Sequence, residues 1–478
     1  MQVTIGKFAL ESLTMGMYSD PLVIFREYIQ NAVDSLDEAV DRRMITLSEG
    51  RIDVIISRVE RRIVIEDNGC GIPEWQAPRL LLDIGNSRKR ELNARGFRGI
   101  GRLAGLGHAK SVSFQTSFSG EECATVLYFD AEKLQQMMLP GQAEGLDLVA
   151  LLEKATHIST QPEKNEAHYF RVTLEHIQQD ELLDVKAIRD YLCENAPLPY
   201  DPQLFSWGSA IQQAFADRRL ELKEYSVYLC EETGEEQLLF KPFRDQFLVD
   251  KQKKLLDQIE DIEVFDIRDN QGTVLALAWV GRSQLLGGIL NPLIRGLRFR
   301  KGNILIGGRT TLNGLFKEER FNGWFQGEIF VLDRRLIPNA RRDDFERNSA
   351  YAEILLALEQ FCNDLSRTVR QVSADRNAWK KQSLCDKKDL KEDAGKAFEL
   401  YDKELSGAIK GLDALQSLQK LSGDRAATRY SALNIAQRMT MAEKKALETV
   451  FDVLLEELGA EKGEQVILKL VRRLKVVE

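Results

Sequence analysis

Apolar and polar positions follow two different periods over residues 1–195, one typical of helices and one typical of strands. Between residues 21 and 43 the apolar residues recur at helical spacing, and Pro21 suits a helix start. Alternating or β-branched runs predict strands at 52–57, 62–66, 111–117, 124–129 and 169–174. Strands mixed with helices in this way predict a two-layer α/β domain over residues 1–195.

The pattern changes further along the chain. A turn-rich stretch, APLPYDPQ at 196–203, predicts a domain boundary after residue 195. Residues 196–348 mix both periods again, with strands expected at 227–230, 273–280, 303–306 and 328–332. Over 349–478 helical patterns rich in Lys and Glu take over, as in 351–372 and 441–458. We therefore expect an α+β protein with two α/β domains and a helical C-terminal region. That region could form a coiled-coil seam and thereby a homodimer.

Composition narrows the class of protein. With 44% hydrophobic and 29% charged residues, the 478-residue chain is typical of soluble globular proteins. Its net charge of -8 gives no global attraction to nucleic acid or anionic lipid. No two cysteines have the C-x-x-C spacing of zinc sites, and neither a signal peptide nor a membrane-spanning stretch is evident. We expect a cytoplasmic protein that does not contact a membrane.

The first candidate site segment is the helix pattern FREYIQNAVDSLDEA at 25–39. Glu27, Asn31 and Asp34 lie at i, i+4 and i+7, on one face of a helix that is otherwise suited to burial. A magnesium nucleotide would explain these groups, because Mg²⁺ takes oxygen ligands such as the Asn31 amide, and Glu27 could polarise a water. The alternative is an ordinary amphipathic helix with a solvated acidic face.

The second segment is IVIEDNGCGIP at 63–73. Asp67 follows a strand, and a carboxylate at that position can accept a hydrogen bond from an exocyclic amine. Gly69 and Gly71 would let a flat ring approach the backbone. The alternative is a D-N-G turn between two strands.

The third segment is RGFRGIGRLAGLG at 95–107, in which Gly96, Gly99 and Gly101 precede an expected helix. Backbone amides at such a start bind phosphate well. The preceding DIGNSRKR adds polar and basic groups that could reach a phosphate, namely Asp83, Ser87, Arg88 and Lys89. A solvated loop would explain them equally well.

The order and spacing of the three segments resemble the Bergerat-fold (GHKL) ATPases: gyrase, ninety-kilodalton heat-shock chaperones, sensor histidine kinases and MutL-type repair proteins. The resemblance implies an ATPase with ATP and Mg²⁺ as cofactors, Asn31 on the metal, Asp67 reading adenine and Glu27 activating water. It implies an ATP site made of Asn31, Asp34, Asp67, Gly69, Gly71, Ile72, Asp83, Ser87, Lys89, Gly96, Phe97, Arg98, Gly99, Ile100, Gly101 and Arg102.

Within this superfamily the heat-shock chaperones look most similar, through segments 12–39 and 168–200. EIFVLDRRLIPNARRDDFERN at 328–348 resembles their middle-domain segment, which implies a ribosomal S5-like middle domain and a catalytic arginine for the γ-phosphate. Alignment on Asn339 gives Arg342 that role, with Arg341 the fallback. The alternative is that both arginines pair with Asp343 and Asp344 at a helix start.

The chain departs from the chaperone pattern in three places. Tyr169 and Phe170 stand where those proteins carry G-T, Arg102 replaces an aromatic residue, and no chaperone-type dimerisation domain is recognised. The task of the ATPase therefore stays open between a chaperone-like clamp on a protein client and a nucleic-acid-linked or antiviral-defence ATPase that signals to an effector protein. The basic stretch 295–303 mildly favours nucleic acid, although a solvated strand face is the more common explanation of such a stretch. A binding module without turnover is the third alternative.

Overall fold

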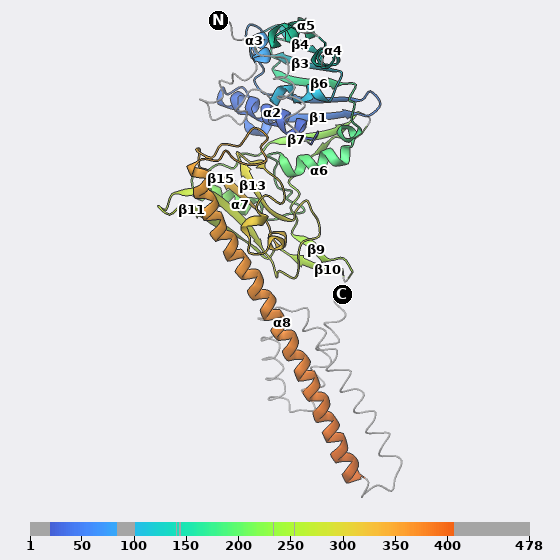
Figure 1. The fold of residues 1–478 in the computed structure, drawn as a ribbon, viewed down its shortest axis with the longest axis vertical. Coiled ribbons are helices and arrows are strands. Elements are labelled where there is room, and N and C mark those ends of the chain that lie inside the picture. The colour runs from blue at the N-terminus through green and yellow to red at the C-terminus, as the bar shows by residue number, and fades with distance from the viewer. Residues whose placement is uncertain are drawn as a thin grey trace. The chain divides into compact units, whose positions relative to one another are not determined.

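The computed structural model describes residues 20–83, 101–139, 141–142, 145–232, 234–252 and 254–405, with side chains as far as residue 379 (Figure 1). By its internal contacts the chain divides into two compact units, 1–378 and 379–478. Both predicted α/β domains fall within the first unit. Every contact described below belongs to that unit.

The first part of the chain forms an eight-stranded sheet in the order β5-β4-β3-β6-β2-β1-β7-β8 (Figure 1). All neighbouring strands are antiparallel except β1 and β7, which are parallel. The strands are β1 (Arg51–Ser57), β2 (Arg62–Asp67), β3 (Ser111–Ser117), β4 (Cys123–Asp130), β5 (Thr156–Pro162), β6 (Tyr169–Glu175), β7 (Ser226–Glu231) and β8 (Gln237–Leu238).

Helices cover one face of this sheet, which gives two layers around one apolar core. Alternate strand residues such as Ile63, Ile65 and Val112 point into the core, where they meet Phe25 and Leu36 of α2. The helices are α2 (Val23–Asp41), α3 (Ala77–Leu82), α4 (Ala131–Met138), α5 (Leu148–Ala155) and α6 (Val185–Asn195), with 3-10 turns η1 (Leu47–Glu49), η3 (Gly101–Gly107) and η4 (Asp180–Leu183).

The five strands predicted in residues 1–195 are confirmed as β1, β2, β3, β4 and β6. β5 escaped prediction because its sequence, THISTQP, is polar and lies largely exposed at the sheet edge. The sheet also continues past the predicted boundary at residue 195, because β7 pairs with β1 and β8 pairs with β7.

A five-stranded sheet follows, in the order β11-β12-β15-β13-β14, beside a separate pair of strands, β9 and β10. α7 packs on one face through the cluster that contains Leu277 and Trp279, and α8 packs on the other through Ala276 and Ala278. The elements are α7 (Gly208–Asp217), β9 (Gln246–Asp250), β10 (Leu255–Gln258), β11 (Asp261–Arg268), β12 (Val274–Arg282), β13 (Gly296–Lys301), β14 (Ile304–Ile306), η5 (Asn313–Leu315), η6 (Glu319–Trp324), β15 (Gln326–Val331) and α8 (Ser349–Leu405).

α8 begins after Asn348, whose side-chain oxygen accepts a hydrogen bond from the Tyr351 amide at 2.9 Å. Ile354, Leu358, Phe361 and Leu365 recur at helical spacing and are buried against the five-stranded sheet. The predicted helix at 351–372 lies within α8, whereas 441–458 lies outside the described residues. Among the described helices, none is both long and apolar enough to cross a membrane.

A group of buried charges lies beside the α7 face of the five-stranded sheet. Glu328 of β15 accepts hydrogen bonds from Lys241 (2.9 Å) and Trp279 (3.2 Å), and also from Arg300 and Tyr200. The side chains of Glu328, Lys241 and Arg300 are at most 1% exposed. Burial by itself would raise the pKa of Glu328, but the charges of Arg300 and Lys241 outweigh it and lower that pKa to about 2.

Replacing Glu328 with Gln is expected to lower the free energy of unfolding by about 3–5 kcal/mol, because two buried cations lose their counter-charge. Denaturant unfolding followed by circular dichroism measures this. The control is Glu353→Gln, which removes an ion pair with Arg335 whose side chains are 52% and 37% exposed. That change should cost less than about 1 kcal/mol. Equal losses in the two variants would show that the buried cluster does not stabilise the fold.

Candidate functional site

The first predicted site residue, Glu27, is buried in the first half of α2. It is 7% exposed, and its Oε1 lies 3.5 Å from an Arg26 nitrogen and 3.4 Å from Arg342 Nε. The apolar residues around it pack α2 onto the large sheet, which fixes the direction of the carboxylate. Glu27 and Arg342, assigned separate roles from the sequence, are therefore in contact.

Arg342 lies between β15 and α8, in a segment folded back on itself by an isolated bridge between Pro338 and Phe345. Its backbone is left-handed, with φ of 57°, and its side chain is 12% exposed. The neighbouring Arg341 is exposed, but its carbonyl accepts a hydrogen bond from Arg26 at 2.9 Å across 315 positions of sequence. The arginine pair thus meets α2 through one side chain and one backbone oxygen.

The alternative partners of these arginines are engaged elsewhere. Asp343 accepts a hydrogen bond from the Asn339 amide at 2.6 Å, and Asp344 accepts one from the Tyr351 hydroxyl at 2.7 Å. In addition, α8 begins only at Ser349, so Arg342 is not at a helix start.

Asp67, the second predicted group, is the last residue of β2. It alternates with Ile63 and Ile65, so it lies on the helix-covered face and is 3% exposed. Its Oδ1 accepts a hydrogen bond from the Gly69 amide at 2.9 Å. The turn that follows leads to α3 and does not connect two paired strands, unlike a D-N-G hairpin.

Two glycines let this turn lie tightly between α2 and β3. A Cβ at Gly69 would overlap the Ser35 side chain, and one at Gly71, where φ is 66°, would overlap the Ser117 carbonyl. The Cys70 amide donates to the Ser35 carbonyl at 3.3 Å, one turn beyond Asn31. The first and second segments therefore meet along α2.

Three residues that sequence reasoning missed hold this region in place. Thr116 of β3 accepts a hydrogen bond from the Ile72 amide at 2.8 Å and donates one to the Tyr169 carbonyl at 3.2 Å. His168 Nδ1 lies 2.8 Å from the Gly69 carbonyl. Arg26 is the third, through its contacts with Glu27 and Arg341. Thr116 and His168 could have been found only from the β3-β6-β2 pairing, which sequence periodicity does not reveal. Arg26 could have been found from its place beside Glu27 in the F-x-R-E sequence.

The structure describes the third segment from Gly101 onward, and Gly101 is the first residue of η3. A Cβ there would overlap the Glu27 carboxylate, so the backbone of this segment lies directly against the predicted base. The Tyr28 hydroxyl accepts from the Gly105 amide at 3.0 Å and donates to the Arg102 carbonyl at 3.1 Å. α2 and η3 are thus joined beside Glu27.

Arg102, which the sequence predicts to be part of the ATP site, contacts the end of α3. Its guanidinium donates to the carbonyl oxygens of Leu80 and Asp83 at the end of α3, at 3.0 Å for Asp83. Burial lowers the pKa of Arg102, opposed by the nearby charge of Asp83. A cation at the carboxyl end of a helix also satisfies carbonyls that lack intrahelical partners.

The other predicted residues differ in how far the structure describes them. Asn31 and Asp34 are half-buried on α2, and Ile72 is half-buried after the glycine turn. Ser87, Arg88, Lys89, Gly96, Phe97, Arg98, Gly99 and Ile100 lie outside the described residues.

The structure shows where Tyr169 and Phe170, which stand at the positions of the chaperones' G-T pair, make their contacts. Phe170 stands directly opposite Asp67 in the β2–β6 pairing, and its ring lies 6.1 Å from that of Phe114. The Tyr169 hydroxyl donates to Glu163 at 2.9 Å. The aromatic ring of Phe170 therefore lies opposite Asp67, and Phe170 stands where the chaperones carry the threonine of the G-T pair.

Several buried polar atoms belong to the two segments that carry Glu27 and Arg342. Within the described part of the chain, Arg26 Nε, both amide atoms of Gln30 and Asn339 Oδ1 are buried without a hydrogen bond. Such atoms are costly unless a ligand or water satisfies them.

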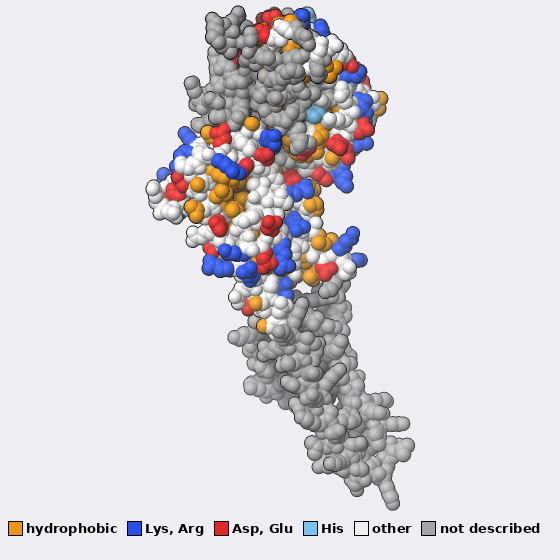
Figure 2. All heavy atoms as spheres, in the orientation of Figure 1, with side chains coloured by type: hydrophobic (Ala, Val, Ile, Leu, Met, Phe, Trp, Pro, Cys, Tyr) orange, Lys and Arg blue, Asp and Glu red, His pale blue; other side chains and the backbone are white. Residues whose placement is uncertain are grey.

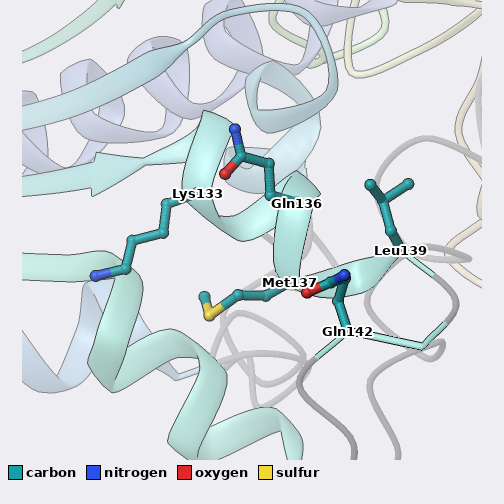
Figure 3. A pocket seen from close by; sticks show the side chains of 5 residues that line it. All are labelled: Lys133, Gln136, Met137, Leu139 and Gln142. Atoms are coloured by element: carbon teal, nitrogen blue, oxygen red, sulfur yellow. The ribbon is translucent and has the colours of Figure 1, made fainter.

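Two surface hollows have linings that do not include Glu27. The one in Figure 3 has a volume of about 370 Å³ and lies at the end of α4, lined by Lys133, Gln136, Met137, Leu139 and Gln142. It contains no predicted site residue. The other, of about 530 Å³, is lined by Pro78, Arg79, Leu82 and the predicted Asp83.

Comparison with known families agrees with this geometry. Residues 20–168 match the family model described as "Histidine kinase-, DNA gyrase B-, and HSP90-like ATPase". No curated protein matches the chain in a sequence search. The matched range includes α2, the Asp67 turn and η3, all of which meet at the site. Residues 20–168 are therefore similar to the GHKL-type ATPase domain that histidine kinases, DNA gyrase B and HSP90-like proteins share.

Proposed function

We propose that the protein hydrolyses ATP slowly and uses the nucleotide state to control the contact between its two sheets. The observation that carries this proposal is the ion pair between Glu27 on α2 and Arg342 beyond β15. Glu27 lies on a helix that covers the first sheet, and Arg342 follows the last strand of the second sheet. The predicted base and the predicted catalytic cation thus come from different sheets and meet in one ion pair. A γ-phosphate bound there would interact with both, so its presence or absence would change the contact.

The nucleotide-binding roles follow from position. Asp67 would accept a hydrogen bond from the adenine amine, since its carboxylate is buried at a strand end beside glycines that admit a ring. Asn31 and Asp34 present oxygen donors on the same helix as Glu27. These donors fit Mg²⁺, which binds one or two protein oxygens together with substrate phosphates and would neutralise charge on them.

Glu27 and Arg342 would act on the reacting groups. The guanidinium groups of Arg26 and Arg342 both lie near Glu27 Oε1. A γ-phosphate would attract these cations, leaving the Glu27 oxygen to accept a proton from the attacking water. Arg342 would then stabilise charge developing on the phosphate. In the ATPases that this chain resembles, the third segment closes as a lid over the triphosphate, and the glycine run of this chain would close in that way and dock the second sheet.

We further propose that this switch acts on a protein client or effector. Of the arginines in the basic stretch 295–303, Arg298 and Arg300 are buried and paired with Glu194 and Glu328, so they do not form a nucleic-acid surface. On the face drawn in Figure 2, the described basic side chains lie interspersed with acidic ones. Leu248 and Leu256, which pair across β9 and β10, are 41% and 55% exposed and offer apolar surface to a protein.

Glu27→Ala is expected to lower kcat by roughly 10²–10⁴-fold, because the general base is lost, while Mg-ATP still binds. The comparison variant is Asp67→Asn, which should weaken ATP binding because the acceptor for adenine is altered. Phosphate release and isothermal titration calorimetry measure the two effects. Unchanged turnover in Glu27→Ala would remove Glu27 from the mechanism, and unchanged affinity in Asp67→Asn would remove Asp67 from adenine recognition.

Arg342→Ala is expected to reduce kcat by about 100-fold or more with little change in ATP affinity, because it removes a cation that acts on the developing charge. Arg341→Ala is the matched control, since only the backbone oxygen of that residue contacts α2. Steady-state kinetics at saturating ATP separates the two. A large effect of Arg341→Ala beside a small one of Arg342→Ala would transfer the role to the neighbour.

The partner class can be tested by stimulation of turnover. An unfolded protein with exposed apolar segments is expected to raise the ATPase rate of the full chain, and Leu248→Ser/Leu256→Ser should reduce that stimulation without changing the basal rate. Single-stranded DNA and RNA are the competing additions. Salt-sensitive stimulation by nucleic acid alone would favour a nucleic-acid-linked ATPase instead.

A further inference from the structure

A second contact between the two sheets lies at the end of α6. The carboxylate of Glu194 accepts hydrogen bonds from Arg309 Nε at 2.9 and 3.0 Å and from an Arg309 terminal nitrogen at 2.8 Å. This is the two-pronged arrangement in which an arginine fixes both distance and orientation. Glu194 belongs to the first sheet's helical layer, and Arg309 follows β14 of the second sheet.

The end of α6 is held by further arginines of β13. Arg298 lies 2.9 Å from Glu194, and Arg300 donates to the Glu194 carbonyl at 2.9 Å. Cations at the carboxyl end of a helix interact favourably with its unpaired carbonyls and its dipole. α6 also packs against α2, the helix that carries Glu27 (Figure 1). The position of Glu194 at the end of α6 is therefore fixed relative to Glu27.

The loop that carries Arg309 also holds the backbone of Arg342. The Gly307 amide donates to the Arg342 carbonyl at 2.8 Å, two positions before Arg309. Gly307 has φ of 73°, and a Cβ there would overlap the Thr311 hydroxyl, so only glycine fits at this turn. Arg342 itself has a left-handed backbone, which surrounding contacts must hold in place.

These contacts form a closed path from Glu194 through Arg309 and Gly307 to Arg342, then through Glu27 and α2 back to α6. We propose that the Glu194–Arg309 ion pair is a positioning element that sets the Arg342 side chain against the site of Glu27. This inference rests on the proposed roles of Glu27 and Arg342 in ATP hydrolysis. Arg309 acts through Arg342 and does not itself contact the reacting groups.

Because Arg309 is partly exposed, its role in positioning Arg342 can be distinguished from a role in stabilising the fold. Its side chain is 40% exposed, whereas that of Arg298 is 1% exposed, so Glu194 keeps a buried counter-charge when Arg309 is removed. Ion pairs with an exposed partner contribute little to the stability of a fold. Loss of Arg309 should therefore leave the chain folded while allowing the Arg342 loop to shift, and catalysis is sensitive to shifts of this kind.

The test is a double-mutant cycle in the full chain, with kcat, ATP affinity and melting temperature measured for Arg309→Ala, Arg342→Ala and the double variant. We expect Arg309→Ala to lower kcat roughly 10- to 100-fold with ATP affinity and melting temperature nearly unchanged. Adding Arg309→Ala to Arg342→Ala should lower kcat no further, since there is then no side chain to position. Arg309→Lys, which keeps the charge but loses the two-pronged geometry, should recover only part of the rate.

Arg320→Ala serves as the control, because it removes an ion pair with Glu318 in which the arginine side chain is 72% exposed. It should leave kcat unchanged. The inference is overturned if Arg309→Ala behaves like this control while Glu27→Ala and Arg342→Ala abolish turnover, or if Arg309→Ala lowers kcat equally with and without Arg342. Failure of the proposed function is distinct, because Glu27→Ala and Arg342→Ala would then themselves leave turnover intact.

Discussion

A carboxylate buried in the first half of a packed helix needs a charged or hydrogen-bonding partner, and for Glu27 that partner comes from the other sheet. α2 is buried along most of its length because it covers the large sheet. Glu27 therefore cannot reach water freely, and Arg26 and Arg342 lie within 3.5 Å of it. The Arg342 segment, Gly101 and the link from Tyr28 to η3 all lie beside Glu27.

The α2 contact and the α6 contact between the sheets differ in character. At α6, Glu194 and the adjacent carbonyls are held by three arginines, two of them buried. At α2, a single arginine side chain and one carbonyl make the connection. Separation at α6 would break the contacts of three arginines, whereas separation at α2 would break those of one side chain and one carbonyl, so it costs more free energy at α6. Under the proposed function, the α6 contact would stay made while the α2 contact responds to the nucleotide.

Much of the first sheet could be predicted because its strands alternate apolar and polar residues. β1, β2 and β3 show this alternation, and their burial follows it. β5 lacked the signal because an edge strand can be polar on both faces. The parallel pairing of β7 with β1 joins residues far apart in sequence, and local periodicity carries no information about such partners. Arg298 and Arg300 looked like a solvated basic surface because sequence shows charge but does not show the carboxylates that neutralise it.

The sequence by itself determined the local chemistry of the site: an acid and an amide on one helical face, an aspartate before a glycine turn, and a later glycine run. These follow from spacing within single elements, where periodicity is decisive. Only the tertiary structure decided which groups meet. It set Arg342 against Glu27, gave Arg341 a backbone role, turned Arg102 towards the end of α3, and joined Arg309 to Glu194. Those choices depend on strand pairing and on the pairing of buried charges, both of which bring together residues that no local pattern connects.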